Sequence, residues 1–144
     1  MEIKQINSED WQEIARIYKQ GIETGIATFE IEVPSWEDWD AAHIKSCRLA
    51  AWNDSQLVGW ATLSAVSGRC VYGGVGEVSV YVDKDYYGNV IGSQLLKKLI
   101  DESEKEGFWT IQSGIFPQNS ASIRLHENLG FRKIGYREKI GKLH

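Results

Sequence analysis

The sequence of 144 residues lacks paired cysteines, long apolar runs and a secretion signal, and each absence excludes a class of protein. Its two cysteines, Cys47 and Cys70, do not form a CxxC pair, so we expect two reduced thiols rather than a disulfide framework. No apolar run approaches the roughly 20 residues that a bilayer span requires. The first ten residues lack the apolar segment of a secretion signal. These absences predict a cytoplasmic protein with no membrane partner.

Basic residues are also scarce, because 16 Lys and Arg stand against 20 Asp and Glu for a net charge of −4. Nucleic acid backbones require clustered Lys and Arg, so no nucleic-acid partner is expected. The three histidines show no metal-ligand spacing, and no metal site is predicted. Repeats, low-complexity tracts and linkers are missing too. The length suits one domain that spans residues 1–144.

What the sequence does contain is an alternation of strand-like and helix-like segments. Apolar residues at helical spacing, and runs rich in β-branched residues, predict an α/β protein with a mixed sheet. The chain stops at Leu143 and His144, where a further sheet strand is expected. The predicted order is a strand from Ile3, helices over 8–19 and 35–43, a hairpin over 48–66, a strand over 77–83, a helix over 91–106, a strand over 109–116, a helix over 119–129 and a strand over 131–141.

The stretch KDYYGNVIGSQLL, residues 84–96, joins a predicted strand to a predicted helix through a turn with two glycines. A glycine-bearing turn before a helix N-terminus is a phosphate-binding arrangement. No GK[ST] follows, and the third glycine of the dinucleotide fingerprint is missing, so neither of those phosphate motifs applies. On this pattern alone, a plain tight turn is an equally good interpretation.

Several segments in the same order resemble a known family. They are GIATFE, SWEDWDAAH, GWATLSAVSGR, EVSVYV and N-x-x-S-x-x-L-H-x-x-x-G-F. Together they resemble the phosphinothricin N-acetyltransferase branch of the GCN5-related N-acetyltransferase (GNAT) superfamily over nearly the whole chain. The resemblance implies a GNAT fold, a central mixed twisted sheet with helices on both faces, whose C-terminal strand is missing or supplied by a partner chain. It also implies a homodimer that transfers acetyl from acetyl-CoA to the amine of a small amino acid or analogue.

Two residues are the predicted catalytic pair. Glu77 opens the EVSVYV strand, and the resemblance assigns its carboxylate the role of base towards the acceptor amine. The alternative is a solvated carboxylate at a strand end. His126 lies in RLHEN, and the resemblance pairs it with the strand glutamate as an acid or proton relay. By itself, a lone histidine is more often structural.

The predicted cofactor contacts surround the 84–96 stretch. The resemblance places backbone N–H groups near Val80 and Tyr81 as the oxyanion site and the pantetheine arm beside Val80 and Val82. Asn119 either binds that arm or caps a helix, or does both. In the family's pyrophosphate motif Val90 replaces a glycine and Tyr87 an Arg or Gln, so Val90 is costly only if its φ is positive. The residues predicted to hold the pyrophosphate are Gly88, Asn89, Val90, Ile91, Gly92 and Ser93.

The acceptor pocket is predicted in the loops after residues 25 and 66. The resemblance places there an apolar wall, a cation and a carboxylate, from Phe29, Glu30, Arg69 and Tyr72. Arg48 is a weaker candidate, because it also flanks a strand. Two other functions stay open. One is acetylation of a protein N-terminus or a polyamine, and the other is a non-catalytic acyl-CoA-binding domain.

Overall fold

A computed structural model describes residues 1–28, 30–65, 74–87, 90–115 and 118–132. The predicted strand over 131–141 lies largely outside these residues. The elements that precede it in the prediction are found in the predicted order. They are β1 (Glu2–Gln5), η1 (Ser8–Asp10), α1 (Trp11–Thr24), α2 (Trp36–Ala42), β2 (Arg48–Asn53), β3 (Gln56–Ala65), β4 (Val75–Val82), η3 (Lys84–Tyr86), α3 (Ile91–Lys105), β5 (Thr110–Gln112) and α4 (Ser120–Asn128).

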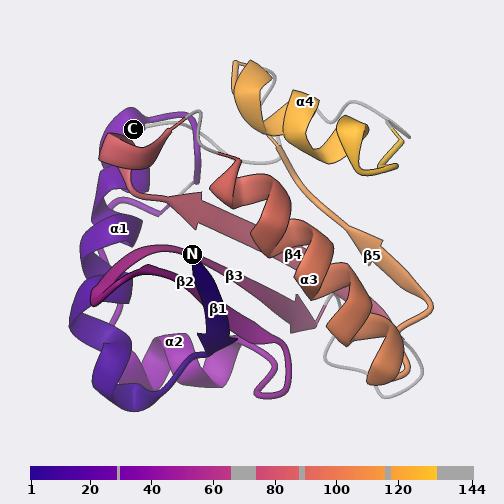
Figure 1. Cartoon of the computed structure of the whole chain (residues 1–144), viewed down its shortest axis with the longest axis horizontal. Coiled ribbons are helices and arrows are strands. Elements are labelled where there is room, and N and C mark those ends of the chain that lie inside the picture. The colour runs from indigo at the N-terminus through magenta and orange to yellow at the C-terminus, as the bar shows by residue number, and fades with distance from the viewer. Residues whose placement is uncertain (29, 66–73, 88–89, 116–117, 133–144) are drawn as a thin grey trace.

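The described strands form one sheet in the order β1-β2-β3-β4-β5. Strands β1 to β4 pair antiparallel, and β4 pairs parallel with β5. A parallel pair needs a crossover connection, and α3 provides it by running back across the sheet (Figure 1). The sheet is therefore mixed, as the sequence predicted.

Helices cover both faces of this sheet. Leu95, Leu96 and Leu99 of α3 are fully buried against one face. Burying each of these leucines contributes about 1.5–3 kcal/mol. The other face packs against α1 and α2, where Ile14, Ile17 and other apolar residues surround Trp39 and Trp60. The predicted arrangement of helices on both faces is confirmed.

A glycine sets how closely α1 approaches the sheet. A Cβ atom at Gly21 would lie 2.5 Å from the ring of Tyr81 on β4. The Tyr81 ring also stacks on Trp60 of β3, with centroids 4.6 Å apart. Only glycine permits this contact without a shift of the ring. The close approach brings α1 to the end of β4, where the candidate site begins.

Candidate active site

The second half of β4 has no β5 residue opposite it. The pairing of β5 with β4 ends where Gln112 lies opposite Glu77. On the other side, the Asp83 N–H donates to the Val58 carbonyl at 2.9 Å, and the ladder with β3 continues from there. Hydrogen-bonding residues alternate along an antiparallel pair. The N–H and C=O groups of Val80 and Val82 therefore face the side where β4 no longer pairs with β5.

The same alternation separates two residues that the sequence grouped together. The N–H of Val80 faces the open edge of β4. The N–H of Tyr81 faces Trp60, its register partner in β3. The candidate oxyanion donor is therefore the Val80 N–H. The Tyr81 side chain packs on the sheet face covered by α1 and α2. Burial raises the pKa of the Tyr81 phenol, which keeps it neutral.

The turn before α3 contains a left-handed residue. Val90, at the N-cap of α3, has φ 59° and ψ 10° and is 64% exposed. The sequence left two options for this position, and the structure has the strained one, which costs about 1–2 kcal/mol for a residue with a Cβ. The predicted phosphate-binding residues Gly88 and Asn89 lie outside the described residues.

The first residues of α3 offer amide groups that the helix itself does not use. The N–H groups of Ile91, Gly92 and Ser93 come before the first intrahelical bond, and the partial positive charge of the helix N-terminus adds to them. A Cβ at Gly92 would lie 3.1 Å from Leu125 Cδ2. Gly92 therefore lets α4 pack close to the start of α3, beside the open edge of β4.

Glu77 lies at the point where β5 and β4 separate. It pairs with Ser64 of β3 on one side and with Gln112 of β5 on the other. Its carboxylate reaches the segment after β5, because its Oε1 lies 3.3 Å from the position of a Cβ at Gly114. A larger residue at position 114 would crowd this carboxylate. Glu77 is half-buried at the mouth of the gap, not a fully solvated strand end.

His126 is buried on α4 and held in one orientation. Its Nδ1 lies 2.7 Å from the Ser122 carbonyl, and its ring meets Phe131 edge-on at 4.9 Å. A carbonyl oxygen only accepts, so Nδ1 carries the proton and Nε2 presents a lone pair. Nε2 has no hydrogen-bond partner among the described residues. Burial lowers the pKa of His126, against a smaller opposing effect of the Ser122 bond.

Asn119 caps α4. Its Oδ1 accepts a hydrogen bond from the Ser122 N–H at 3.2 Å. The cap that the sequence allowed is therefore present, and its amide nitrogen has no bond in the described contacts. Asn119 and His126 thus stand at the start and the last turn of the same short helix.

A pocket of about 370 Å³ lies on the α1–α2 face of the sheet. Ser64 connects it to the gap, because Ser64 is the register partner of Glu77 and their side chains share one face. Of the four predicted acceptor residues only Glu30 is among the described lining, since Phe29, Arg69 and Tyr72 lie outside the described residues. The described lining residues are Tyr18, Glu30, Pro34, Asp38, Trp39, Ala42, His43 and Ser64.

The sequence did not predict the α1 and α2 residues of this pocket. Tyr18 and Trp39 showed only core-facing helical spacing. His43 donates from Nδ1 to the Trp39 carbonyl at 2.7 Å, and its ring lies tilted against the Trp39 ring with centroids 4.5 Å apart. Burial lowers the pKa of His43, with the nearby Arg48 acting in the same direction. It is therefore a neutral ring in the pocket wall at neutral pH.

Arg48 is bonded to the segment that joins α2 to β2 and to α2 itself. Its side chain is buried and donates to Asp40 Oδ1, Asp40 O, His43 O and Ile44 O at 2.6–3.2 Å. Its guanidinium also lies over the Trp39 ring at 5.2 Å. These contacts occupy four of its five N–H donors at the C-terminal end of α2. They give Arg48 a structural role, and its weaker role towards a substrate stays a prediction.

The site's donors suit an extended acyl-carrying cofactor with a phosphate group. The open edge of β4 offers N–H and C=O groups to an amide-containing arm, and the first turn of α3 offers N–H groups to an anion. The unpartnered Nε2 of His126 adds one buried acceptor. In the described segments, no three His, Cys, Asp or Glu side chains gather as metal ligands. None of the described helices is long and apolar enough to cross a membrane.

Comparison with known proteins agrees with this geometry. Residues 4–131 match the model of the acetyltransferase (GNAT) family. The chain is 30% identical over 142 residues to a phosphinothricin N-acetyltransferase of Streptomyces coelicolor, covering 93% of this chain and 83% of that protein. It is 35% identical over 108 residues to an L-methionine sulfoximine/L-methionine sulfone acetyltransferase of Salmonella typhimurium, covering 65% and 63%.

A solved structure extends the agreement to three dimensions. The GNAT superfamily phosphinothricin acetyltransferase (Pat) from Sinorhizobium meliloti, in complex with AcCoA, is 26% identical. It superposes with a TM-score of 0.84, and the match covers 93% of this chain and 76% of that chain. The chain therefore belongs to the acetyltransferase (GNAT) family, as its motifs suggested.

Proposed function

We propose that this protein is an N-acetyltransferase that moves the acetyl group of acetyl-CoA to the amino group of a small amino acid or amino-acid analogue. The observation that carries the proposal is the junction of three features at one place. Glu77 stands where β4 and β5 separate, the open edge of β4 begins there, and the acceptor-side pocket meets it through Ser64. An amine in the pocket thus has a carboxylate beside an edge suited to a thioester arm.

Glu77 acts as the base. A free aliphatic ammonium titrates near 10, so an acceptor amine must lose a proton before its lone pair can attack the thioester carbonyl. The half-buried carboxylate accepts that proton directly or through water. The new C–N bond forms as the C–S bond breaks, and the departing thiolate takes up a proton.

His126 carries a proton towards that thiolate. Its lowered pKa keeps the ring neutral near pH 7, and Nδ1 is already committed to Ser122. The free Nε2 therefore takes up the proton that the amine releases, through Glu77 and water, and passes it to the departing thiolate, which makes a relay a better description than a standing acid. The N–H of Val80 stabilises the charge that develops on the carbonyl oxygen.

The remaining cofactor contacts follow the chain. The pyrophosphate is received by amides of residues 88–93 at the start of α3, the pantetheine arm lies beside Val80 and Val82, and Asn119 bonds to that arm with the amide nitrogen its cap leaves over. The named relatives support the cofactor and the class of acceptor, because two are named for acetylation of amino-acid analogues and the third was solved with AcCoA.

The acceptor binds in the pocket that Ser64 joins to Glu77. From the sequence, Arg69 pairs with the anionic group of an amino acid, while Phe29 and Tyr72 add apolar contact. Glu30 lines the described part of the pocket and receives an ammonium or closes the loop. Phosphinothricin and methionine sulfoximine have the required shape, with a carboxylate, an amine and a second polar head.

A cationic acceptor is the second candidate. Two carboxylates, Glu30 and Asp38, line the described wall of the pocket beside the aromatic ring of Trp39. Carboxylates and an aromatic face favour a cation. A polyamine or a protein N-terminus would use this wall without needing Arg69.

The deciding experiment measures thiol release from acetyl-CoA across a panel of amino acids, their analogues and spermidine. We expect amino-acid analogues to be the best acceptors, whereas a clear preference for spermidine would select the second candidate.

Glu77→Gln should lower kcat by about 10² while CoA affinity is retained. His126→Phe should also slow turnover, and in the double variant the two losses should not multiply. Turnover at the wild-type rate in Glu77→Gln would remove Glu77 from the mechanism.

The setting of the enzyme is part of the same proposal. We place it in the cytoplasm, because Cys47 is a free thiol in the part of the chain that the structure describes. We expect a homodimer, which light scattering coupled to size-exclusion chromatography tests directly; a monomer at micromolar concentration would contradict it.

A further inference from the structure

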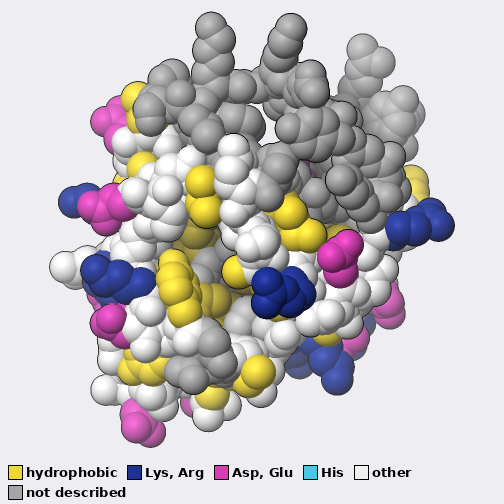
Figure 2. Space-filling model, turned by 90° about the horizontal axis from the view of Figure 1, so that it is seen from above, with side chains coloured by type: hydrophobic (Ala, Val, Ile, Leu, Met, Phe, Trp, Pro, Cys, Tyr) yellow, Lys and Arg dark blue, Asp and Glu magenta, His cyan; other side chains and the backbone are white. Residues whose placement is uncertain are grey.

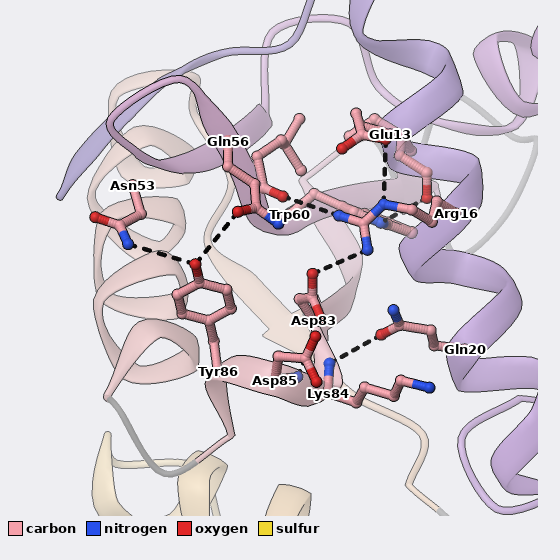
Figure 3. A network of polar contacts seen from close by, with 12 residues as sticks. Glu13, Arg16, Gln20, Asn53, Gln56, Trp60, Asp83, Lys84, Asp85 and Tyr86 are labelled. Carbon is pink, nitrogen blue, oxygen red and sulfur yellow. Dashed lines mark hydrogen bonds and ion pairs between the residues drawn. The ribbon is translucent and has the colours of Figure 1, made fainter.

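The short helix η3, which leads into the turn before α3, is held by side chains from two other parts of the fold (Figure 3). The Lys84 N–H donates to Gln20 Oε1 of α1 at 2.9 Å. The Tyr86 hydroxyl donates to Gln56 Oε1 at 3.4 Å and accepts from Asn53 Nδ2 at 3.5 Å, both from the β2–β3 hairpin. A three-residue helix cannot hold itself in place, so these contacts fix it.

Asp83 is the centre of this arrangement. It is 1% exposed and follows directly on β4. Its Oδ1 accepts from the Asp85 N–H at 3.0 Å and so caps η3, and its Oδ2 accepts from Arg16 Nη1 at 2.9 Å. Arg16 lies on α1, one helical turn before Gln20. Helix α1 therefore contacts the start of η3 twice, through Arg16 at Asp83 and through Gln20 at Lys84.

Arg16 itself is anchored. Its Nη2 donates to the Leu57 carbonyl at 3.2 Å, and its Nε donates to Glu13 at 3.1 Å. The bond to Leu57 links the guanidinium to β3, whereas Glu13 is a partly exposed neighbour on the same helix. Among these three bonds, the one to Asp83 connects Arg16 to the segment that leads through η3 to the turn before α3.

Val90 lies downstream of this arrangement in a conformation that valine avoids. Its φ of 59° falls in the left-handed region, and no hydrogen bond from its own side chain holds it there. Its side chain is 64% exposed, so packing of valine itself does little to compensate. Local strain of this kind persists only where the surrounding structure over-determines it.

We propose that Arg16 is a positioning residue for the cofactor: acting through Asp83, it fixes η3 and so keeps Val90 left-handed, which aims the first N–H groups of α3 at the pyrophosphate. The inference rests on the proposed function. We call the Arg16–Asp83 contact the tether. A glycine at position 90 would take up the same conformation without strain, so the tether would no longer be needed. Arg16 and Val90, on different elements, are therefore energetically coupled.

A double-mutant cycle tests the coupling by calorimetric titration with CoA. Arg16→Met should weaken CoA binding roughly tenfold, which corresponds to about 1.4 kcal/mol. Val90→Gly should bind CoA at least as tightly as the wild type. The double variant should recover most of the loss, because glycine no longer needs the tether. Glu13→Gln is the matched control, since it removes only the negative charge of the partly exposed partner of Arg16, and its CoA affinity should match the wild type.

A split in the kinetic constants separates positioning from general damage. Arg16→Met should raise the KM for acetyl-CoA and leave kcat at saturating cofactor, and the acceptor KM, close to wild type. Equal CoA affinity in Arg16→Met and Glu13→Gln would overturn the inference, as would the same loss with valine and with glycine at position 90. If Arg16→Met does not fold, Gln20→Leu replaces it in the same cycle. Absence of CoA binding by the wild type would instead refute the proposed function.

Discussion

Replacing Val90 with glycine should make the protein more stable, although the change removes a side chain. The left-handed conformation costs a residue with a Cβ about 1–2 kcal/mol. Glycine avoids that cost but gives up about 0.5–1 kcal/mol because its unfolded chain is freer. The valine side chain is 64% exposed, so little apolar burial is lost. The difference leaves a gain of about 0.5–1 kcal/mol.

Urea unfolding followed by tryptophan fluorescence measures this gain, since the chain has six tryptophans. A gain of this size raises Tm by about 1–4 °C in a protein of this length. Val90→Ala is the first control, because alanine keeps the Cβ and should recover only part of the gain. Gly25→Ala is the second, because Gly25 has φ 74° with open space around it and should lose stability from strain alone.

The comparison between glycine and alanine decides the outcome. If Val90→Gly is no more stable than Val90→Ala, the Cβ at position 90 is not strained. The backbone at the start of α3 would then be helical or extended in solution, and the coupling proposed for Arg16 would lose its basis.

Three further predictions concern buried groups. Arg48→Met should lower the free energy of unfolding by more than about 1 kcal/mol, because it removes the buried donor from the backbone carbonyls of Asp40, His43 and Ile44; a smaller loss in urea titration would contradict the structural role of Arg48. Burial lowers the pKa of His126, so its contribution to stability is full above the unfolded value of about 6.5 and falls as the pH drops below it; unfolding midpoints at pH 7.5 and 5.5 should differ less in His126→Gln than in the wild type. Gly21→Ala should cost about 1–3 kcal/mol, because the new Cβ would lie 2.5 Å from the Tyr81 ring, and Tyr81→Leu should relieve much of that cost.

The sequence by itself determined the elements and their order. Helical spacing in Leu95, Leu96 and Leu99 and β-branched runs such as the one in β4 depend on the local chain, and local propensity decides them. The Ser35 cap of α2, whose Oγ accepts from the Asp38 N–H, is local in the same way. The motifs that carry Glu77 and His126 also lie in continuous segments, so the family was evident before any contact was known.

Only the tertiary structure decided how those elements combine into a site. The register with β3 turned the N–H of Val80, and not that of Tyr81, to the open edge of β4. The pocket joins Tyr18 to Ser64, and the tether joins Arg16 to Asp83, a separation of 67 residues. Pairings across such distances depend on packing between elements, and no local pattern encodes them. The positive φ of Val90 has the same origin, because valine alone avoids it and the surrounding contacts impose it.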